Sequence, residues 1–101
     1  MSKGSILIVD DEANARTALA ELLREEGYTV ETAADGFKAL GKLEETPPDL
    51  VLTDLKMPGM GGVELLEKVK GIDDEIVVVV MTASGAVETA VDAMKRGAAN
   101  Y

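Results

Sequence analysis

Acidic side chains follow two of the short apolar runs in this sequence. Asp10 and Asp11 come directly after the run at residues 6–9, and Asp54 ends the run at residues 49–54. Carboxylates that lie close together raise one another's pKa, and Mg²⁺ relieves that repulsion because it binds oxygen ligands. A carboxylate can also act as a nucleophile toward a phosphoryl group. If these runs are neighbouring strands, the acids predict a magnesium site at which phosphoryl transfer takes place.

Hydrogen-bond donors follow a third apolar run, at residues 76–81. The Thr82 hydroxyl can donate to a phosphoryl oxygen, and the backbone N–H of Ala83 can add a second hydrogen bond. Asp54 is the candidate nucleophile and also a metal ligand, together with the acidic pair after the first run. Lys56, two positions further on, is expected to lend its backbone carbonyl to the metal.

The composition excludes several other chemistries. The 101-residue chain has no cysteine and no histidine, so disulfides, thiolate metal sites and histidine catalysis are ruled out. The formal net charge is −9, from 10 basic and 19 acidic residues, which argues against direct binding of nucleic acid, because phosphates need a cationic surface. The chain contains no glycine-rich nucleotide-binding motif, G-x-x-x-x-G-K-[ST] or G-x-G-x-x-G.

Membrane insertion is not expected either. No segment approaches the roughly 20 apolar residues that a membrane span requires. The N-terminal residues are not followed by an apolar stretch of signal-peptide length. The expected location is therefore cytoplasmic.

The apolar runs alternate with segments of helical periodicity. Runs 6–9 and 76–81 do not alternate between apolar and polar residues, which is typical of strands covered on both faces, whereas 28–33 alternates as an edge strand does. The stretch 49–54 is a further strand. The helical stripes expected to face the core are Ala15, Ala18, Leu19, Leu22 and Leu23; Phe37, Leu40 and Leu43; Val63, Leu65, Leu66 and Val69; and Val87, Ala90, Val91 and Met94.

Polar residues and glycines indicate where these helices begin and end. Asn14 or Asp11 is expected to cap the first helix, and Asp35 the second. Gly27 lies where a helix C-terminus favours glycine. Glu12 is interpreted as a helix-start acid that interacts with the helix dipole or with a water near the metal.

The strand–helix alternation predicts one α/β domain over residues 1–101. Its expected architecture is a doubly wound parallel sheet with helices on both faces, a three-layer α/β/α sandwich. Ligands of such folds bind beyond the carboxyl ends of the strands, where the strand order reverses. The candidate residues all follow strands, so they fall at that edge of the sheet.

Four segments resemble the consecutive motifs of the response-regulator receiver domain of two-component signalling. They read LIVDDE, DLVLTDLKMPGMGG, VVVMTASG and AMKRGAANY, and the resemblance covers essentially the whole chain. Within that family, MPGM and MTASGAVETAVDAMKRGA most resemble receivers of sigma-54-dependent, enhancer-binding transcription activators. The resemblance implies the flavodoxin-like strand order 2-1-3-4-5, with the fifth strand and fifth helix missing or vestigial in this chain.

The resemblance also implies a role for each candidate residue, and it adds a switch aromatic, Tyr101, which turns inward as the switch hydroxyl moves toward the phosphoryl group. The matches are Asp54 to the phosphorylated aspartate, Asp10 and Asp11 to the acidic pair that binds Mg²⁺, Lys56 to the carbonyl donor, Thr82 to the switch hydroxyl, and Ala83 to the small residue beside it.

The implied function is a regulatory phosphoacceptor switch rather than a stand-alone enzyme. A sensor histidine kinase supplies the phosphoryl group in a Mg²⁺-dependent reaction. The domain catalyses its own phosphorylation and dephosphorylation, and a downstream, transcriptional output domain or effector responds.

The family's lysine, followed by proline, lies a few positions beyond Tyr101, where this chain has ended. One alternative is therefore a truncated, non-switching interaction fragment that forms a homodimer or domain swap through the edge at 76–81. Another is a small phosphotransferase or phosphatase of a different α/β family, although those with an aspartyl nucleophile usually carry D-x-D after the first strand, where this chain has Asp10-Asp11-Glu12.

Overall fold

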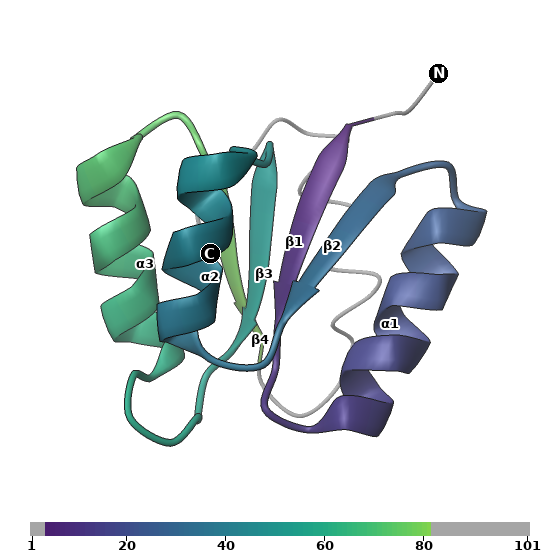
Figure 1. The fold of residues 1–101 in the computed structure, drawn as a ribbon, viewed down its shortest axis with the longest axis horizontal. Helices are drawn as coiled ribbons and strands as arrows, with labels where there is room; N and C mark the ends of the chain where they lie inside the picture. Colours follow the sequence, from purple (N-terminus) through teal and green to yellow (C-terminus); the bar gives the residue numbers. More distant parts are fainter. Residues whose placement is uncertain (1–3, 82–101) are drawn as a thin grey trace.

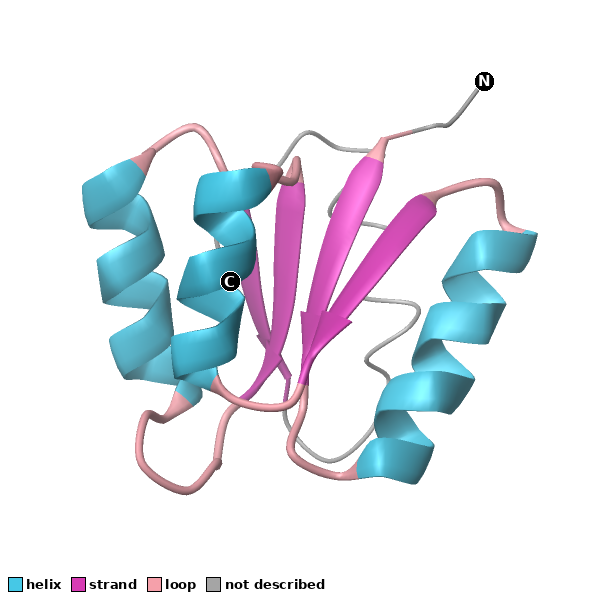
Figure 2. Ribbon diagram, viewed as in Figure 1, coloured by secondary structure: helices cyan, strands magenta, loops and turns pink. Residues whose placement is uncertain are grey.

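A computed structural model describes residues 4–81 of the chain as a parallel sheet with helices packed on both faces (Figures 1 and 2). Within the described residues no helix is both long enough and apolar enough to cross a membrane. The expected fourth helix lies outside this range. The described elements are β1 (Ser5–Val9), α1 (Ala13–Glu25), β2 (Thr29–Ala33), α2 (Gly36–Glu45), β3 (Leu50–Asp54), α3 (Gly62–Ile72) and β4 (Val77–Met81).

The described strands pair in the order β2-β1-β3-β4, and every pair is parallel. This order reverses direction at β1, as the predicted doubly wound topology requires. Helix α1 covers one face of the sheet, and α2 and α3 cover the other (Figure 1). The predicted fold class is thus confirmed, and the carboxyl ends of β1 and β3 lie side by side at one edge.

Strand β1 is buried on both faces, which explains why its sequence does not alternate. Ile6 and Ile8 belong to the cluster that includes α1, whereas Leu7 and Val9 belong to the cluster that includes α2 and α3. All four side chains are at most 1% exposed. In contrast, β2 lies at the edge of the described sheet, where its alternation of apolar and polar residues predicted it.

The ends of the first two helices show which capping predictions hold. The Asp35 carboxylate accepts a hydrogen bond from the Lys38 N–H at 2.8 Å and caps α2, as predicted. Gly27 has a φ of 100°, a left-handed conformation that favours glycine after a helix. The predicted cap of α1 was wrong, because Glu12 is the N-cap residue and its carboxylate accepts from Asn14 N and Ala15 N.

The sets of helix residues predicted to face the core include several that are exposed to solvent. Leu22, Phe37 and Val63 are exposed, with 48%, 65% and 54% of their surface accessible. Small or better-placed neighbours, such as Ala20 and Ala39, take the buried positions instead. A short helix that lies flat on a sheet buries only the residues that point directly at the sheet, so large apolar residues at the margin of the stripe face solvent.

Two positions of α3 provide a direct test of this narrow buried face. Leu65 is fully buried, whereas Val63 is exposed. Leu65→Ala is expected to lower the free energy of unfolding by about 3 kcal/mol, because it opens a cavity between α3 and the sheet. Val63→Ala is expected to change it by less than about 0.5 kcal/mol. Urea denaturation followed by circular dichroism measures both changes, and equal losses would contradict the observed helix orientation.

Candidate functional site

The structure brings three acidic side chains together at the carboxyl edge of the sheet. The register of β1 and β3 pairs Val9 with Thr53, so the residues that follow, Asp10 and Asp54, are neighbours. One carboxylate oxygen from each of Asp10, Asp11 and Asp54 lies within 4.8 Å of the others. The predicted gathering of distant acids in one pocket is therefore present in the fold.

The three acids differ in their exposure to solvent. Asp10 is buried, with 8% of its surface accessible, Asp54 is half-buried and Asp11 is exposed. The Asp10 carboxylate accepts a hydrogen bond from the Glu12 N–H at 2.9 Å, and the Asp10 carbonyl accepts one from Arg16 Nη1 at 2.7 Å. These contacts fix the turn between β1 and α1, so the buried carboxylate has little freedom to move away from its neighbours.

The pKa of Asp10 is raised above the usual carboxyl value of 3.8. Burial is the main cause, and the negative charges of Asp54, Asp11 and Glu12 add to it, while the hydrogen bond from the Glu12 N–H acts in the opposite direction. A charged Asp10 is thus costly in the metal-free protein. This is the electrostatic state that a bound cation relieves.

The donor set fits Mg²⁺. All three side chains supply hard carboxylate oxygens, and with one of them exposed and one half-buried the group is open to solvent, as an ion that keeps bound water requires. Lys56 lies two positions beyond Asp54, on the loop between β3 and α3, and it is exposed. The expected role of the Lys56 backbone carbonyl stays a prediction.

The loop after Asp54 is held against the ends of β3 and β4. Leu55 N donates to the Met81 carbonyl at 3.1 Å, and Gly62 N donates to the Leu55 carbonyl at 2.9 Å. Met60 from the same loop is 2% exposed and belongs to the cluster formed with α2 and α3. These contacts anchor both ends of the loop and leave its central residues at the surface.

Gly62 packs against the backbone of the candidate nucleophile, a contact that the sequence alone did not predict. A Cβ atom at Gly62 would overlap the backbone carbonyl oxygen of Asp54. The start of α3 can therefore approach the candidate nucleophile only because residue 62 has no side chain. The signal in the sequence was the glycine pair at 61–62, which ends the motif DLVLTDLKMPGMGG.

Three predicted site residues lie outside the described range, namely Thr82, Ala83 and Tyr101. The described part of the chain ends beside the site, because the β3–β4 register pairs Asp54 with Met81, the residue before Thr82. The roles of these three residues stay predictions.

Comparison with known proteins points to one family. The family described as "Response regulator receiver domain" matches residues 6–101. The chain is 42% identical to sporulation initiation phosphotransferase F of Bacillus subtilis over 101 residues, which is 100% of this chain and 82% of that protein. It is 46% identical to the transcriptional regulatory protein ZraR of Klebsiella oxytoca over 96 residues, which is 95% of this chain but only 22% of ZraR.

Solved structures give the same result. The receiver domain of the hybrid histidine kinase CckA superposes with a TM-score of 0.80 at 34% identity, covering 93% of this chain and 98% of that one. NtrX from Brucella abortus, solved in complex with ATP, superposes with a TM-score of 0.78 at 37% identity, covering 97% of this chain and 23% of NtrX.

Gly62→Ala tests the close approach at Asp54. The added methyl group overlaps the Asp54 carbonyl, so the β3–α3 loop must shift, and the free energy of unfolding is expected to fall by about 2 kcal/mol. Gly41→Ala is the matched control, because nothing lies within 4 Å of its Cβ position on α2. That change is expected to stabilise the protein by about 0.5–1 kcal/mol. A neutral or stabilising Gly62→Ala, measured by thermal denaturation, would show that the approach is not tight.

Asp10→Asn tests the repulsion among the acids. Asparagine retains an oxygen that can accept from the Glu12 N–H but carries no charge, so the melting temperature without divalent ions is expected to rise at neutral pH. Because the folded-state pKa of Asp10 is raised, its destabilising charge is fully present above that pKa and absent below 3.8, the unfolded value. The gain should therefore vanish at pH 3.

Addition of Mg²⁺ should reverse the order of the two proteins. The ion is expected to raise the melting temperature of the wild type, since it binds the folded state, and to affect Asp10→Asn much less. Differential scanning fluorimetry with EDTA and with Mg²⁺ measures both effects. An equal Mg²⁺ response in the two proteins would remove Asp10 from the site.

Proposed function

Because this chain belongs to the response regulator receiver family, we propose that residues 1–101 form one receiver domain that accepts a phosphoryl group on Asp54. The observation that carries the proposal is the meeting of three carboxylates from β1 and β3 within 4.8 Å, with Asp54 accessible to solvent. The likeness to receivers of sigma-54-dependent transcription activators is confirmed, since ZraR, NtrC and AtoC are among its relatives.

The proposed reaction transfers the phosphoryl group from a histidine nitrogen of a sensor kinase. An oxygen of Asp54 attacks the phosphorus in line with the leaving nitrogen, so that the P–N bond breaks as the O–P bond forms. One product is an acyl phosphate on Asp54. The other is the kinase histidine, whose leaving nitrogen takes up a proton so that the side chain is neutral. Asp54 is half-buried, so part of its surface is accessible to such a donor.

Asp10, Asp11 and Asp54 would hold Mg²⁺, together with the Lys56 carbonyl. When bound, the ion supplies positive charge that offsets the repulsion between the acids and the incoming phosphoryl oxygens. Asp10 is held in place by its Glu12 hydrogen bond. It therefore offers a ligand oxygen at a fixed position beside the nucleophile, so that little reorganisation is needed when the donor arrives.

We further propose that the domain promotes both steps of its own cycle. In the proposed second step a water molecule attacks the phosphorus of the acyl phosphate, the bond from phosphorus to the Asp54 oxygen breaks, and inorganic phosphate leaves as Asp54 is regenerated. Thr82 and the N–H of Ala83 are the proposed donors to phosphoryl oxygens, and Tyr101 is the proposed switch aromatic. All three follow from the family resemblance.

The regulated output is proposed to be transcription. ZraR is named a transcriptional regulatory protein and NtrC a DNA-binding transcriptional regulator, and this chain covers only 22% of either. Receiver domains partner with histidine kinases and linked output domains, so the proposed partners are a sensor kinase and such an output domain or effector. Nucleic acid is not a proposed partner of residues 1–101 themselves.

A second candidate is the interaction fragment that dimerises or exchanges strands. β4 reads VVVVM and pairs on one side only, with β3, among the described strands. An apolar edge of this kind favours pairing with another copy. The prediction is tested by light scattering, in which a monomer at high concentration would count against it.

Asp54→Asn is expected to abolish phosphorylation, because the amide cannot form the acyl phosphate. The purified chain is incubated with Mg²⁺ and a small phosphoramidate, which mimics phosphohistidine, and intact mass spectrometry detects the added phosphoryl group. The wild-type adduct should be removed by hydroxylamine, as an acyl phosphate is. Asp74→Asn, an exposed position between α3 and β4, is the matched control and should react as the wild type does. An adduct that persists in Asp54→Asn would assign the acceptor role to another residue.

A further inference from the structure

The outer edge of β2 is open in the described part of the chain, because β2 pairs only with β1. Thr29 N donates to the Gly4 carbonyl, and the Ala33 carbonyl accepts from Asp10 N, so the odd-numbered residues of β2 direct their backbone groups toward β1. In a parallel pair the intervening residues direct theirs outward. Thr32 is such a residue, and its N–H and C=O have no strand partner among residues 4–81.

One end of this edge is already covered by a side chain. Arg24 Nη2 donates to the backbone carbonyl of Val30 at 2.9 Å. This carbonyl therefore points away from β1, toward the outer edge of the sheet. The half-buried Thr32, two residues further along, is left as the open position of the strand. The unpaired part of the edge is thus short and lies toward the carboxyl end of β2.

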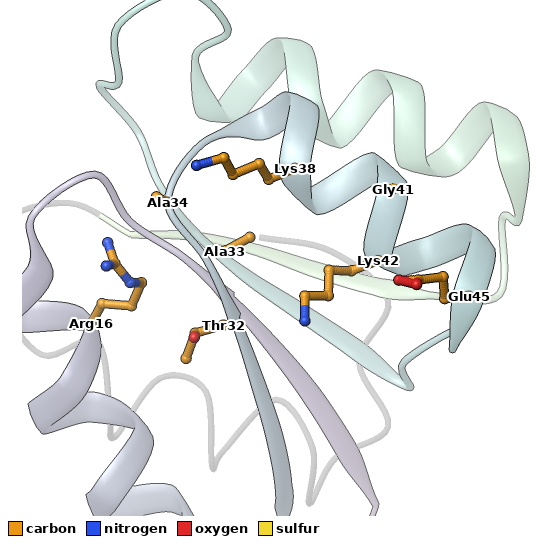
Figure 3. Close-up of a pocket in the computed structure, with 8 residues that line it drawn as sticks. All are labelled: Arg16, Thr32, Ala33, Ala34, Lys38, Gly41, Lys42 and Glu45. Atoms are coloured by element: carbon orange, nitrogen blue, oxygen red, sulfur yellow. The ribbon is translucent and has the colours of Figure 1, made fainter.

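A hollow of about 490 Å³ lies over this open part of the edge (Figure 3). Arg16 reaches it from α1, and Lys38 and Lys42 reach it from α2, so that cations approach Thr32 from both faces of the sheet. The residues that line the hollow are Arg16, Thr32, Ala33, Ala34, Lys38, Gly41, Lys42 and Glu45.

The charge of the hollow is opposite to that of the chain. The chain carries −9, yet three of its 10 basic residues line this one surface, against the single acid Glu45. Lys42 is held only loosely, at 3.9 Å from Glu31, and Lys38 has no ion pair with a described residue. Arg16 donates to a backbone carbonyl, so its charge is not neutralised by a carboxylate.

The hollow is extended along the strand rather than closed. A second hollow of about 320 Å³ shares Lys42 and Glu45 with the first and continues over Thr29 and Glu31 of the same strand. Its floor includes the apolar residues Ile6 and Leu7 of β1. The two hollows adjoin at Lys42 and Glu45 and together border β2 from Thr29 to Ala33, a length that suits an extended chain better than a compact anion.

We infer that the edge of β2 binds an extended acidic segment of a partner protein as an additional strand. Its backbone pairs with the N–H and C=O of Thr32, and its carboxylates lie between Arg16, Lys38 and Lys42. Strand addition supplies backbone hydrogen bonds, and the cations select an acidic sequence over a neutral or basic one. Asp54 does not line this site, although Arg16 contacts both the hollow and the Asp10 carbonyl.

The inference is tested with a fluorescein-labelled peptide in which glutamate and valine alternate, added to the 101-residue chain and followed by fluorescence anisotropy. Binding is expected to weaken about fivefold for each of Lys38→Glu and Lys42→Glu, since each removes an attraction and adds a repulsion of surface magnitude. Lys68→Glu is the matched control, because Lys68 is an exposed lysine on α3, away from the hollow. Lys38→Gln separates the loss of a positive charge from the gain of a negative one.

Amide hydrogen exchange by NMR tests the strand pairing itself. Bound peptide should protect the Thr32 N–H, while Glu31 and Ala33, which already face β1, should change little. A peptide that alternates glutamine and valine should bind much more weakly. Binding that ignores Lys38→Glu and Lys42→Glu, or that leaves Thr32 unprotected, would overturn the proposal. Inorganic phosphate that shifts the Lys38 and Lys42 resonances while the peptide does not bind would identify a small-anion site instead and would likewise overturn it.

Discussion

The repulsion among Asp10, Asp11 and Asp54 is the constraint around which the carboxyl edge of the sheet is organised. A buried carboxylate beside two others destabilises the folded protein unless a cation is present, and the raised pKa of Asp10 expresses that cost. The hydrophobic clusters on both faces of β1 and β3 fix the two strands side by side. The sheet therefore holds the acids together against their repulsion, which is the arrangement that the proposed cation site requires.

The loop after β3 shows how backbone geometry serves the same site. Gly62 allows the first turn of α3 to pass against the Asp54 carbonyl, and the Leu55–Met81 hydrogen bond ties the end of β3 to β4. Met60, at the end of the same loop, is buried in the core. Movement of either end of the loop therefore disturbs the core or the backbone of Asp54, so changes at these ends are coupled to the fold.

Much of this arrangement could be predicted from the sequence, because it depends on patterns that extend over whole elements. Apolar runs without alternation predicted β1 and β4 as strands covered on both faces, and an acid after each of two runs predicted the pocket. The family motifs then predicted the strand order that makes β1 and β3 neighbours. These inferences depend on the period of side chains and on the rule that parallel strands end at one edge.

The details that the sequence did not predict were decided by local competition. Asp11, Glu12 and Asn14 can all cap a helix by residue type, and Glu12 does so because its own N–H is fixed by the Asp10 carboxylate. Phe37 matched the periodicity of a buried stripe, yet it is 65% exposed, and Ala39 is the residue of α2 that faces the core. Such outcomes depend on distances between elements, which a one-dimensional pattern does not contain.

The acidic pocket and the basic hollow meet at Arg16. Its guanidinium donates to the Asp10 carbonyl and also lines the hollow at the β2 edge, so a single side chain contacts both charged regions. Opposite charges on adjacent surfaces of a strongly acidic chain stabilise each other only weakly through solvent, but a ligand that excludes water at one of them strengthens the interaction. An acidic strand on β2 would be attracted by the positive charge of Arg16, and a cation at Asp10 would be repelled by the same charge. The occupancy of each site should therefore influence the other through this residue.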